Sequence, residues 1–131
     1  MQQWIKKLDT SSDDYVEAIA VDSSDNLYVG GHTYGAFTGI NAGGLDAFFA
    51  KYDSTGETQE WIVQLGTTND DRLDAMAVDS NDNLLVGGRT GWIARYSSSG
   101  SAKFYLQLGT GSLEAIAVDA SDNIFAGGYT E

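Results

Sequence analysis

The feature that most constrains the fold of this chain is a segment that occurs three times. Its copies read YVEAIAVDSSDNLYVGGHT at residues 15–33, RLDAMAVDSNDNLLVGGRT at residues 72–90 and SLEAIAVDASDNIFAGGYT at residues 112–130. A segment that recurs in this way is typical of repeat architectures, in which each unit buries its apolar surface against its neighbours. The fold must therefore repeat along the chain as well.

Each copy has the hydrophobic pattern of a β-hairpin. In the first copy Ile19 and Val21 alternate with Ala18 and Ala20, which places branched side chains on one face of a strand and small ones on the other. Residues 22–26 break the alternation with Ser, Asp and Asn, which favour tight turns. The Gly-Gly pair that ends the second strand predicts a bend or a close neighbouring backbone.

Further strands are expected before the first copy and between the copies, and the chain shows no helical periodicity. The expected positions are residues 4–8, 47–52, 60–65, 92–96 and 103–108. Together with the hairpins they give four strands in each period of about 40 to 45 residues, as in a β-propeller blade. A flat β-sandwich would also have strands whose side chains alternate between two faces. It would not need the same sequence motif to recur so closely.

We therefore predict an all-β fold of four-stranded antiparallel propeller blades, with just under three blades in the chain. Residues 1–131 are expected to form a single repeat domain, with repeats at about 4–60 and 61–103 and an incomplete one at 104–131. Because known propellers close with about four to eight blades, two interpretations stay open. The chain is a slice of a longer propeller, or it completes a ring or stack with copies of itself.

The same residues resemble the bacterial β-propeller repeat family called SBBP. The family pattern runs Trp, Leu-Gly-Thr, an acidic residue with Ala-x-Ala-Val-Asp, a turn with Gly-Asn, Tyr-Val-x-Gly, and Asp-Ala-Phe-x-x-Lys-Tyr-Asp. The matching residues are Trp61, Leu65, Gly66, Thr67, residues 74–79, Asn83 and residues 86–88, with 46–48 and 51–53 in the preceding period. The resemblance implies a propeller fold and an extracellular, cell-surface or virion setting, and it names no activity, because propellers host unrelated functions.

The chain departs from the family pattern in two places. Asp25, Asp82 and Asp122 stand where the family usually has the turn glycine. If that backbone is left-handed, each aspartate costs about 1 kcal/mol, softened by local hydrogen bonding. The second departure is the shortened residues 91–97, where no counterpart of Asp46 is present to repeat its contact.

The composition excludes several classes of partner. A formal net charge of -12 repels phosphate backbones and anionic lipid surfaces, so we expect no nucleic-acid partner. No apolar run is long enough to span a membrane, and the first residues lack the apolar stretch of a signal peptide, so no membrane insertion is expected. Cysteine is absent, which removes disulfides and thiol chemistry.

Catalysis is not expected either. His32 is the single histidine, and the chain has neither cysteine nor a Gly-x-Ser-x-Gly elbow, so a nucleophile with its base is missing. The acidic pairs at residues 13–14 and 70–71 lie in hydrophilic turns, where solvated charge is the ordinary explanation.

Binding residues are expected where the repeats differ. Residues 34–45 are an insertion that the second repeat replaces with Gly91, and such insertions often map to a binding face. One position between Gly-Gly and Thr also varies from copy to copy, either because it meets a partner or because it is a tolerant surface site. The candidate contacts are His32, Tyr34, Phe37, Asn41, Arg89 and Tyr129.

Two further patterns have a structural and a functional interpretation. Carboxylates and amides in the turns, at Asp22, Asp79, Asn81, Asn83 and Asp119, imitate the start of a calcium loop. The loop glycine and the final glutamate are replaced by Leu84 and Thr90 in the central copy, so turn geometry is favoured and no cofactor is required. The aromatic residues that begin equivalent strands, Trp4, Trp61 and Phe104, are expected to pack between blades rather than to bind sugars.

The functional expectation is thus a non-enzymatic structural or protein-interaction module. Its partners would be further blades of a longer chain or copies of itself. The alternative is a calcium- or glycan-binding propeller module.

Overall fold

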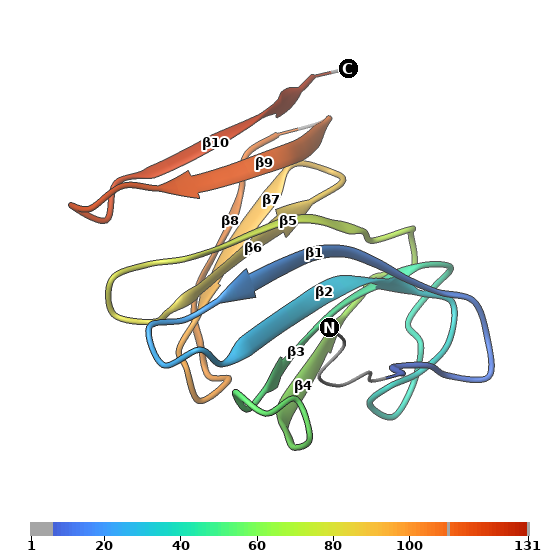
Figure 1. Ribbon diagram of the computed structural model, residues 1–131. Coiled ribbons are helices and arrows are strands. Elements are labelled where there is room, and N and C mark those ends of the chain that lie inside the picture. Colours follow the sequence, from blue (N-terminus) through green and yellow to red (C-terminus); the bar gives the residue numbers. More distant parts are fainter. Residues whose placement is uncertain (1–6, 110, 131) are drawn as a thin grey trace.

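The computed structural model describes residues 7–109 and 111–130, and this part of the chain contains strands and no helix (Figure 1). The strands of the first sheet are β1 (Asp14–Val21), β2 (Leu27–Thr33), β3 (Asp46–Tyr52) and β4 (Gln59–Leu65). Those of the second are β5 (Leu73–Val78), β6 (Leu84–Gly88), β7 (Trp92–Tyr96) and β8 (Ala102–Gln107). The third sheet consists of β9 (Ser112–Val118) and β10 (Ile124–Tyr129).

Within each sheet the strands are antiparallel and follow one another in chain order. The prediction of an all-β fold with four-stranded antiparallel blades is confirmed, and the strands begin and end within a residue or two of their expected positions. The strand expected at residues 4–8 lies largely outside the described residues. No described segment is a helix that could cross a membrane.

The three sheets stack face to face as successive blades. Strands β1, β5 and β9 lie side by side, and the other strands of each sheet follow them outward (Figure 1). Equivalent strands therefore occupy equivalent places in the three sheets. The described sheets form an arc of blades that does not close on itself.

The larger core fills the space between the first two sheets. Tyr28 and Phe49 of the first sheet meet Leu84 and Tyr96 of the second, and the rings of Phe49 and Tyr96 lie 4.7 Å apart, edge to face. The small residues of β1 share one face, as the alternation predicted, and that face packs against this core. Such aromatic pairs add to the free energy of burying their apolar area.

The smaller core lies between the second and third sheets. It contains Ala75, Ile93 and Leu113, with Ile116 and Ile124 packed against them. The third sheet has two described strands, so the far part of the second sheet is left uncovered. The exposed large apolar residues of β8 and the segment after it are Phe104, Tyr105, Leu106 and Leu108.

The second glycine of each Gly-Gly pair lies against a neighbouring backbone. A Cβ atom on Gly31 would stand 1.8 Å from the carbonyl oxygen of Tyr15, and on Gly88 it would stand 1.9 Å from that of Arg72. The strand register shifts at this point in all three sheets. The predicted close approach is therefore present, because the inner strand bulges toward the glycine.

Candidate protein-interaction surfaces

The turn aspartates connect neighbouring blades. Asp25, Asp82 and Asp122 have φ of 64°, 61° and 61°, so the left-handed backbone considered from the sequence is present. The carboxylate of Asp82 accepts hydrogen bonds from the N–H of Ser23 at 3.0 Å and from its hydroxyl at 2.6 Å. Asp122 accepts the same pair from Ser80 at 2.8 and 2.5 Å. We call each serine–aspartate pair an inter-blade clasp.

The clasps explain why aspartate replaces the turn glycine. A glycine would relieve the strained backbone but could not reach the neighbouring blade. The hydrogen bonds from Ser23 and Ser80 hold the pKa of the Asp82 and Asp122 carboxyls below its usual range. Sequence reasoning missed the clasps, although a serine follows the first turn aspartate in the two copies that precede another blade.

The candidate calcium carboxylates hold their own turns together. In the central copy, Asp79 accepts hydrogen bonds from the N–H groups of Asn81 and Asn83 at 3.0 and 2.9 Å, and from the amide of Asn83 at 3.0 Å. Asp22 and Asp119 repeat this arrangement. Within residues 7–109 and 111–130, no group of three or more acidic or histidine side chains could hold a metal ion. The turns are thus Asx turns built by their first carboxylate.

The inserted loop at residues 34–45 is held to the first sheet. The side-chain amide of Asn41 donates hydrogen bonds to the carbonyls of Thr33, Gly35 and Gly44, at 3.1 to 3.3 Å. The ring of Phe37 packs 4.7 Å from that of Phe48. These residues organise the loop, while Tyr34 is exposed.

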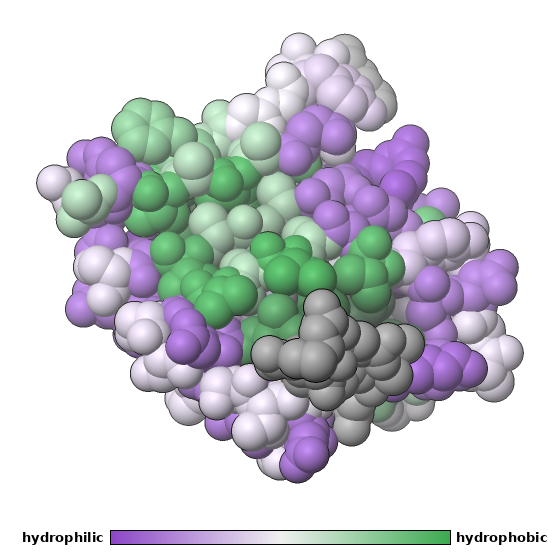
Figure 2. Space-filling model, viewed as in Figure 1, coloured by the Kyte–Doolittle hydropathy of each residue, from purple (hydrophilic) through white to green (hydrophobic). Residues whose placement is uncertain are grey.

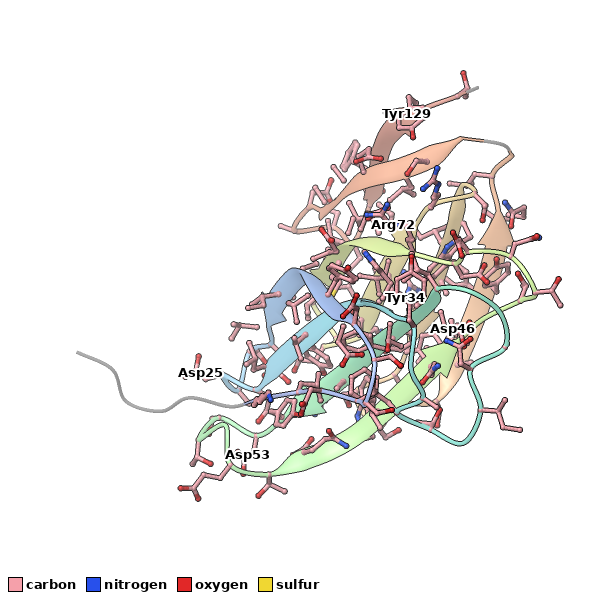
Figure 3. The ribbon with its side chains drawn as sticks, turned by 90° about the vertical axis from the view of Figure 1, so that its right-hand side faces the viewer. Asp25, Tyr34, Asp46, Asp53, Arg72 and Tyr129 are labelled. Carbon is pink, nitrogen blue, oxygen red and sulfur yellow. The ribbon has the colours of Figure 1, made fainter. Side chains whose placement is uncertain are left out.

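Asp46 fixes the end of the inserted loop. Its carboxylate accepts hydrogen bonds from the N–H of Ala42 at 2.8 Å and from the amide of Gln64 at 2.9 Å. The second sheet has no equivalent carboxylate, and its Gln107 donates instead to backbone carbonyls, including that of Gly109 at 3.0 Å. Figure 3 shows Tyr34 and Asp46 at one end of the first sheet and Asp25 and Asp53 at the other.

The three variable positions after Gly-Gly have different surroundings. His32 is only 2% exposed, stacks on the ring of Tyr15 at 5.1 Å and lies 3.6 Å from the carboxylate of Glu17. Burial, followed by the nearby Arg72 guanidinium, lowers the pKa of His32. Arg89 and Tyr129 are exposed. The structure therefore places two of the three side chains where a partner could touch them.

The aromatic residues at the starts of the outer strands also differ in their surroundings. Trp61 packs against the larger core, and its indole N–H donates to the carbonyl of Ser98 in the next blade at 3.0 Å. Phe104 is partly exposed, with the Arg95 guanidinium 5.2 Å from its ring. Trp4 lies outside the described residues. The difference arises because a blade covers Trp61, whereas no described strand covers Phe104.

The first exposed apolar surface lies on the outer side of β1. It consists of Val16, Ile19 and Val21, and we call it the β1 face. Val16 is 53% exposed, whereas its equivalents Leu73 and Leu113 are buried between blades. Hydrophobic side chains form a broad area around β1 and the β9–β10 hairpin in Figure 2. A position that is interior in later blades is thus exposed in the first.

The second exposed surface lies on the opposite side of the arc, and we call it the β10 face. It consists of Ala115, Ala117, Phe125 and Gly127. Phe125 is 59% exposed, whereas its equivalent Tyr28 is fully buried beneath the second sheet.

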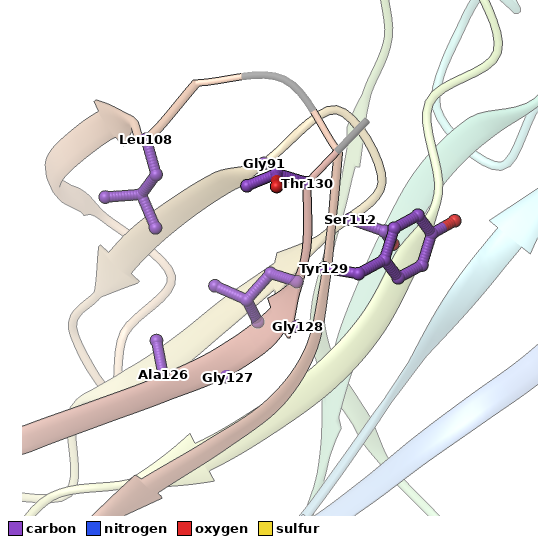
Figure 4. A pocket seen from close by; sticks show the side chains of 9 residues that line it. Gly91, Leu108, Ser112, Ala126, Gly127, Gly128, Tyr129 and Thr130 are labelled. Carbon is purple, nitrogen blue, oxygen red and sulfur yellow. The ribbon is translucent and has the colours of Figure 1, made fainter.

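A pocket of about 190 Å³ lies beside the outer edge of β10 (Figure 4). It is lined by Gly91 and Leu108 of the second blade and by residues 126–130 of the third. The second blade has a third strand, β7, at the equivalent position. Its Trp92 packs with Ala47 of the first blade in the larger core, where the third blade has the pocket. The pocket thus occupies the place where the third strand of a complete blade would lie.

These stacked sheets, with equivalent inner strands and repeated clasps, define a β-propeller-type repeat protein. Residues 3–37 match the model of the SBBP family, described as a beta-propeller repeat. The resemblance seen in the sequence is confirmed. No curated protein matches the chain.

Proposed function

We propose that the chain is a non-enzymatic structural or protein-interaction module whose end blades bind protein. The observation that supports this is the contrast between equivalent positions. Leu73 is fully buried under a neighbouring blade, whereas its equivalent Val16 is 53% exposed. Tyr28 is likewise fully buried, whereas its equivalent Phe125 is 59% exposed. Apolar surfaces of this kind mark interaction sites, since leaving them in water is unfavourable.

The mechanism is surface complementarity on a rigid scaffold. The blades are held in fixed relation by the two apolar cores and by the clasps at Ser23 and Ser80. The edge of β10 offers backbone groups for pairing, and the pocket beside it offers room for a further strand. Exposed Tyr34, Arg89 and Tyr129 are available for polar contacts with a partner.

The proposed setting is extracellular, on a cell surface or on a virion. It rests on the resemblance to the SBBP family alone. Fractionation of the source cells with an antibody to the chain tests the setting, and recovery only from the cytosol would contradict it.

Site-specific photo-cross-linking in the producing cells tests the binding function. A photoreactive amino acid replaces Ile19 or Phe125, and Ile40 serves as the control because it is 84% exposed on the inserted loop, away from both faces. We expect protein adducts, to this chain or another, from positions 19 and 125 and none from position 40. The absence of adducts from both faces would contradict the proposed function.

A further inference from the structure

We propose that the partner of each end face is a second copy of this chain, bound head to tail with its β1 face on the β10 face. This inference rests on the proposed function and names its partner. The two internal interfaces, between the first and second sheets and between the second and third, show what such a contact requires.

In both internal interfaces, apolar side chains of the later blade cover a glycine of the earlier blade. A Cβ atom on Gly30 would lie 2.9 Å from the sulfur of Met76 and 3.1 Å from Leu73. On Gly87 it would lie 3.2 Å from Leu113. At the equivalent Gly127, no atom lies within 4 Å. The β10 face therefore carries the same glycine, uncovered.

The side chains that would cover Gly127 are present on the β1 face. Val16 and Ile19 hold the positions of Leu73 and Met76 in the repeat, on the same side of the inner strand. Both are more than half exposed. The β1 face and the β10 face are thus the two halves of an interface of the kind that the chain forms twice between its own blades.

The clasp is divided between the same two ends. Asp25 has the left-handed backbone of Asp82 and Asp122, and its carboxylate accepts no hydrogen bond from a described residue. Ala120 occupies the place of Ser23 and Ser80, so it offers the N–H of a clasp without the hydroxyl. The interface between copies would therefore contain a single clasp bond, from Ala120 to Asp25.

An interface between two different faces joins copies in a closed ring when the rotation that relates one copy to the next leads back to the first copy. The described residues of one copy form two four-stranded sheets and one two-stranded sheet, so two such sets give six sheets, within the range of about four to eight blades in which propellers close. The net charge of -12 on each copy opposes this contact. Association should therefore strengthen as salt screens the repulsion.

Light scattering after size exclusion measures the assembly, with three variants for comparison. Gly127→Leu fills the uncovered site, and Ile19→Asp places a charge on the β1 face. Ile40→Asp is the matched control on the inserted loop. Gly127 has open space at its Cβ position, and Ile19 and Ile40 are exposed, so all three variants should fold, which thermal melts verify.

We expect wild type and Ile40→Asp to form a dimer of twice 14.0 kDa, tighter at higher salt, and each face variant to be a monomer. An equimolar mixture of Gly127→Leu and Ile19→Asp should form dimers, because each retains the face that the other lacks. A monomeric wild type, or an assembly that neither face variant weakens, would overturn the inference. If position 19 or position 125 still cross-links to a different protein in that case, the proposed function stands. If neither position cross-links to any protein, both fail.

Discussion

Ser23 and Asp82 lie 59 positions apart in the chain and are joined by two hydrogen bonds, from the serine N–H and hydroxyl to the aspartate carboxylate. The pair sits on the hairpin turns of adjacent blades. Because Ser80 and Asp122 repeat it, the contact belongs to the repeat and not to one site. It links the unusual backbone of the turn to the stacking of blades.

Replacing a turn aspartate with glycine should distinguish its backbone strain from its clasp. Asp82→Gly relieves the left-handed backbone and removes the clasp to Ser23, whereas Asp25→Gly relieves the same backbone with no described clasp to lose. We expect a lower melting temperature for Asp82→Gly than for Asp25→Gly. Circular dichroism melts at low protein concentration measure this. Equal melting temperatures would show that the clasp contributes nothing.

Adding a methyl group at equivalent glycines should have unequal effects. Gly30→Ala would force its Cβ against Met76 and Leu73, at a cost of about 1–3 kcal/mol of unfolding free energy for overpacking. Gly127→Ala meets open space and should change stability by less than about 0.5 kcal/mol. Urea denaturation of dilute protein gives both values. A destabilised Gly127→Ala monomer would mean that the β10 face is already covered.

Truncating equivalent apolar residues should show the same asymmetry. Leu73→Ala leaves a cavity in the larger core and should cost about 2–5 kcal/mol. Val16→Ala, on the β1 face, should cost about 0.5 kcal/mol or less in the monomer. Urea denaturation again provides the comparison, and similar losses at the two positions would contradict the exposed placement of Val16.

His32 should make the stability depend on pH. Its pKa is lowered in the folded state by burial and by Arg72, so below the unfolded pKa of about 6.5 the unfolded chain binds a proton that the folded chain does not. Stability should therefore fall as the pH decreases from about 7.5 through 6.5 and toward the lowered folded pKa. His32→Gln, which removes the single histidine, should flatten this part of the curve. Parallel curves for the two proteins would contradict a buried, neutral imidazole.

Calcium should have little effect on the folded protein. The carboxylate of Asp79 already accepts three hydrogen bonds from its own turn, and Asp22 and Asp119 do the same. Since a ligand that binds only the folded state raises its stability, millimolar calcium should leave the melting temperature unchanged. A rise on adding calcium that chelator reverses would show that the turns bind the ion.

The sequence predicted what depends on local pattern. Alternation around Ala18 and Ala20 located the inner strands, and turn residues at 22–26 located the hairpins, because strand faces and tight turns depend on neighbouring residues. The Gly-Gly pairs indicated the close backbone approach at Gly31. The departure from the family's turn glycine at Asp25 raised the question of a left-handed backbone, and the structure has φ of 64° there.

The sequence could not predict contacts that form only when blades stack. The bond between Ser23 and Asp82 depends on the offset between sheets, which no local pattern encodes. His32 is buried, with its ring stacked on that of Tyr15 and near the charge of Arg72 from the next blade, so its variation among copies did not imply exposure. Asn41 looked like a binding residue, but its amide donates hydrogen bonds within the loop.

Carbene footprinting of the monomeric Gly127→Leu variant tests the central claim most directly, because the reagent labels side chains according to their exposure. The claim is that equivalent positions are covered inside the arc of blades and uncovered at its ends. We predict strong labelling of Val16 and Phe125 and negligible labelling of their buried counterparts Leu73 and Leu85. Comparable labelling of all four residues would contradict the stacking of the blades and the account built on it.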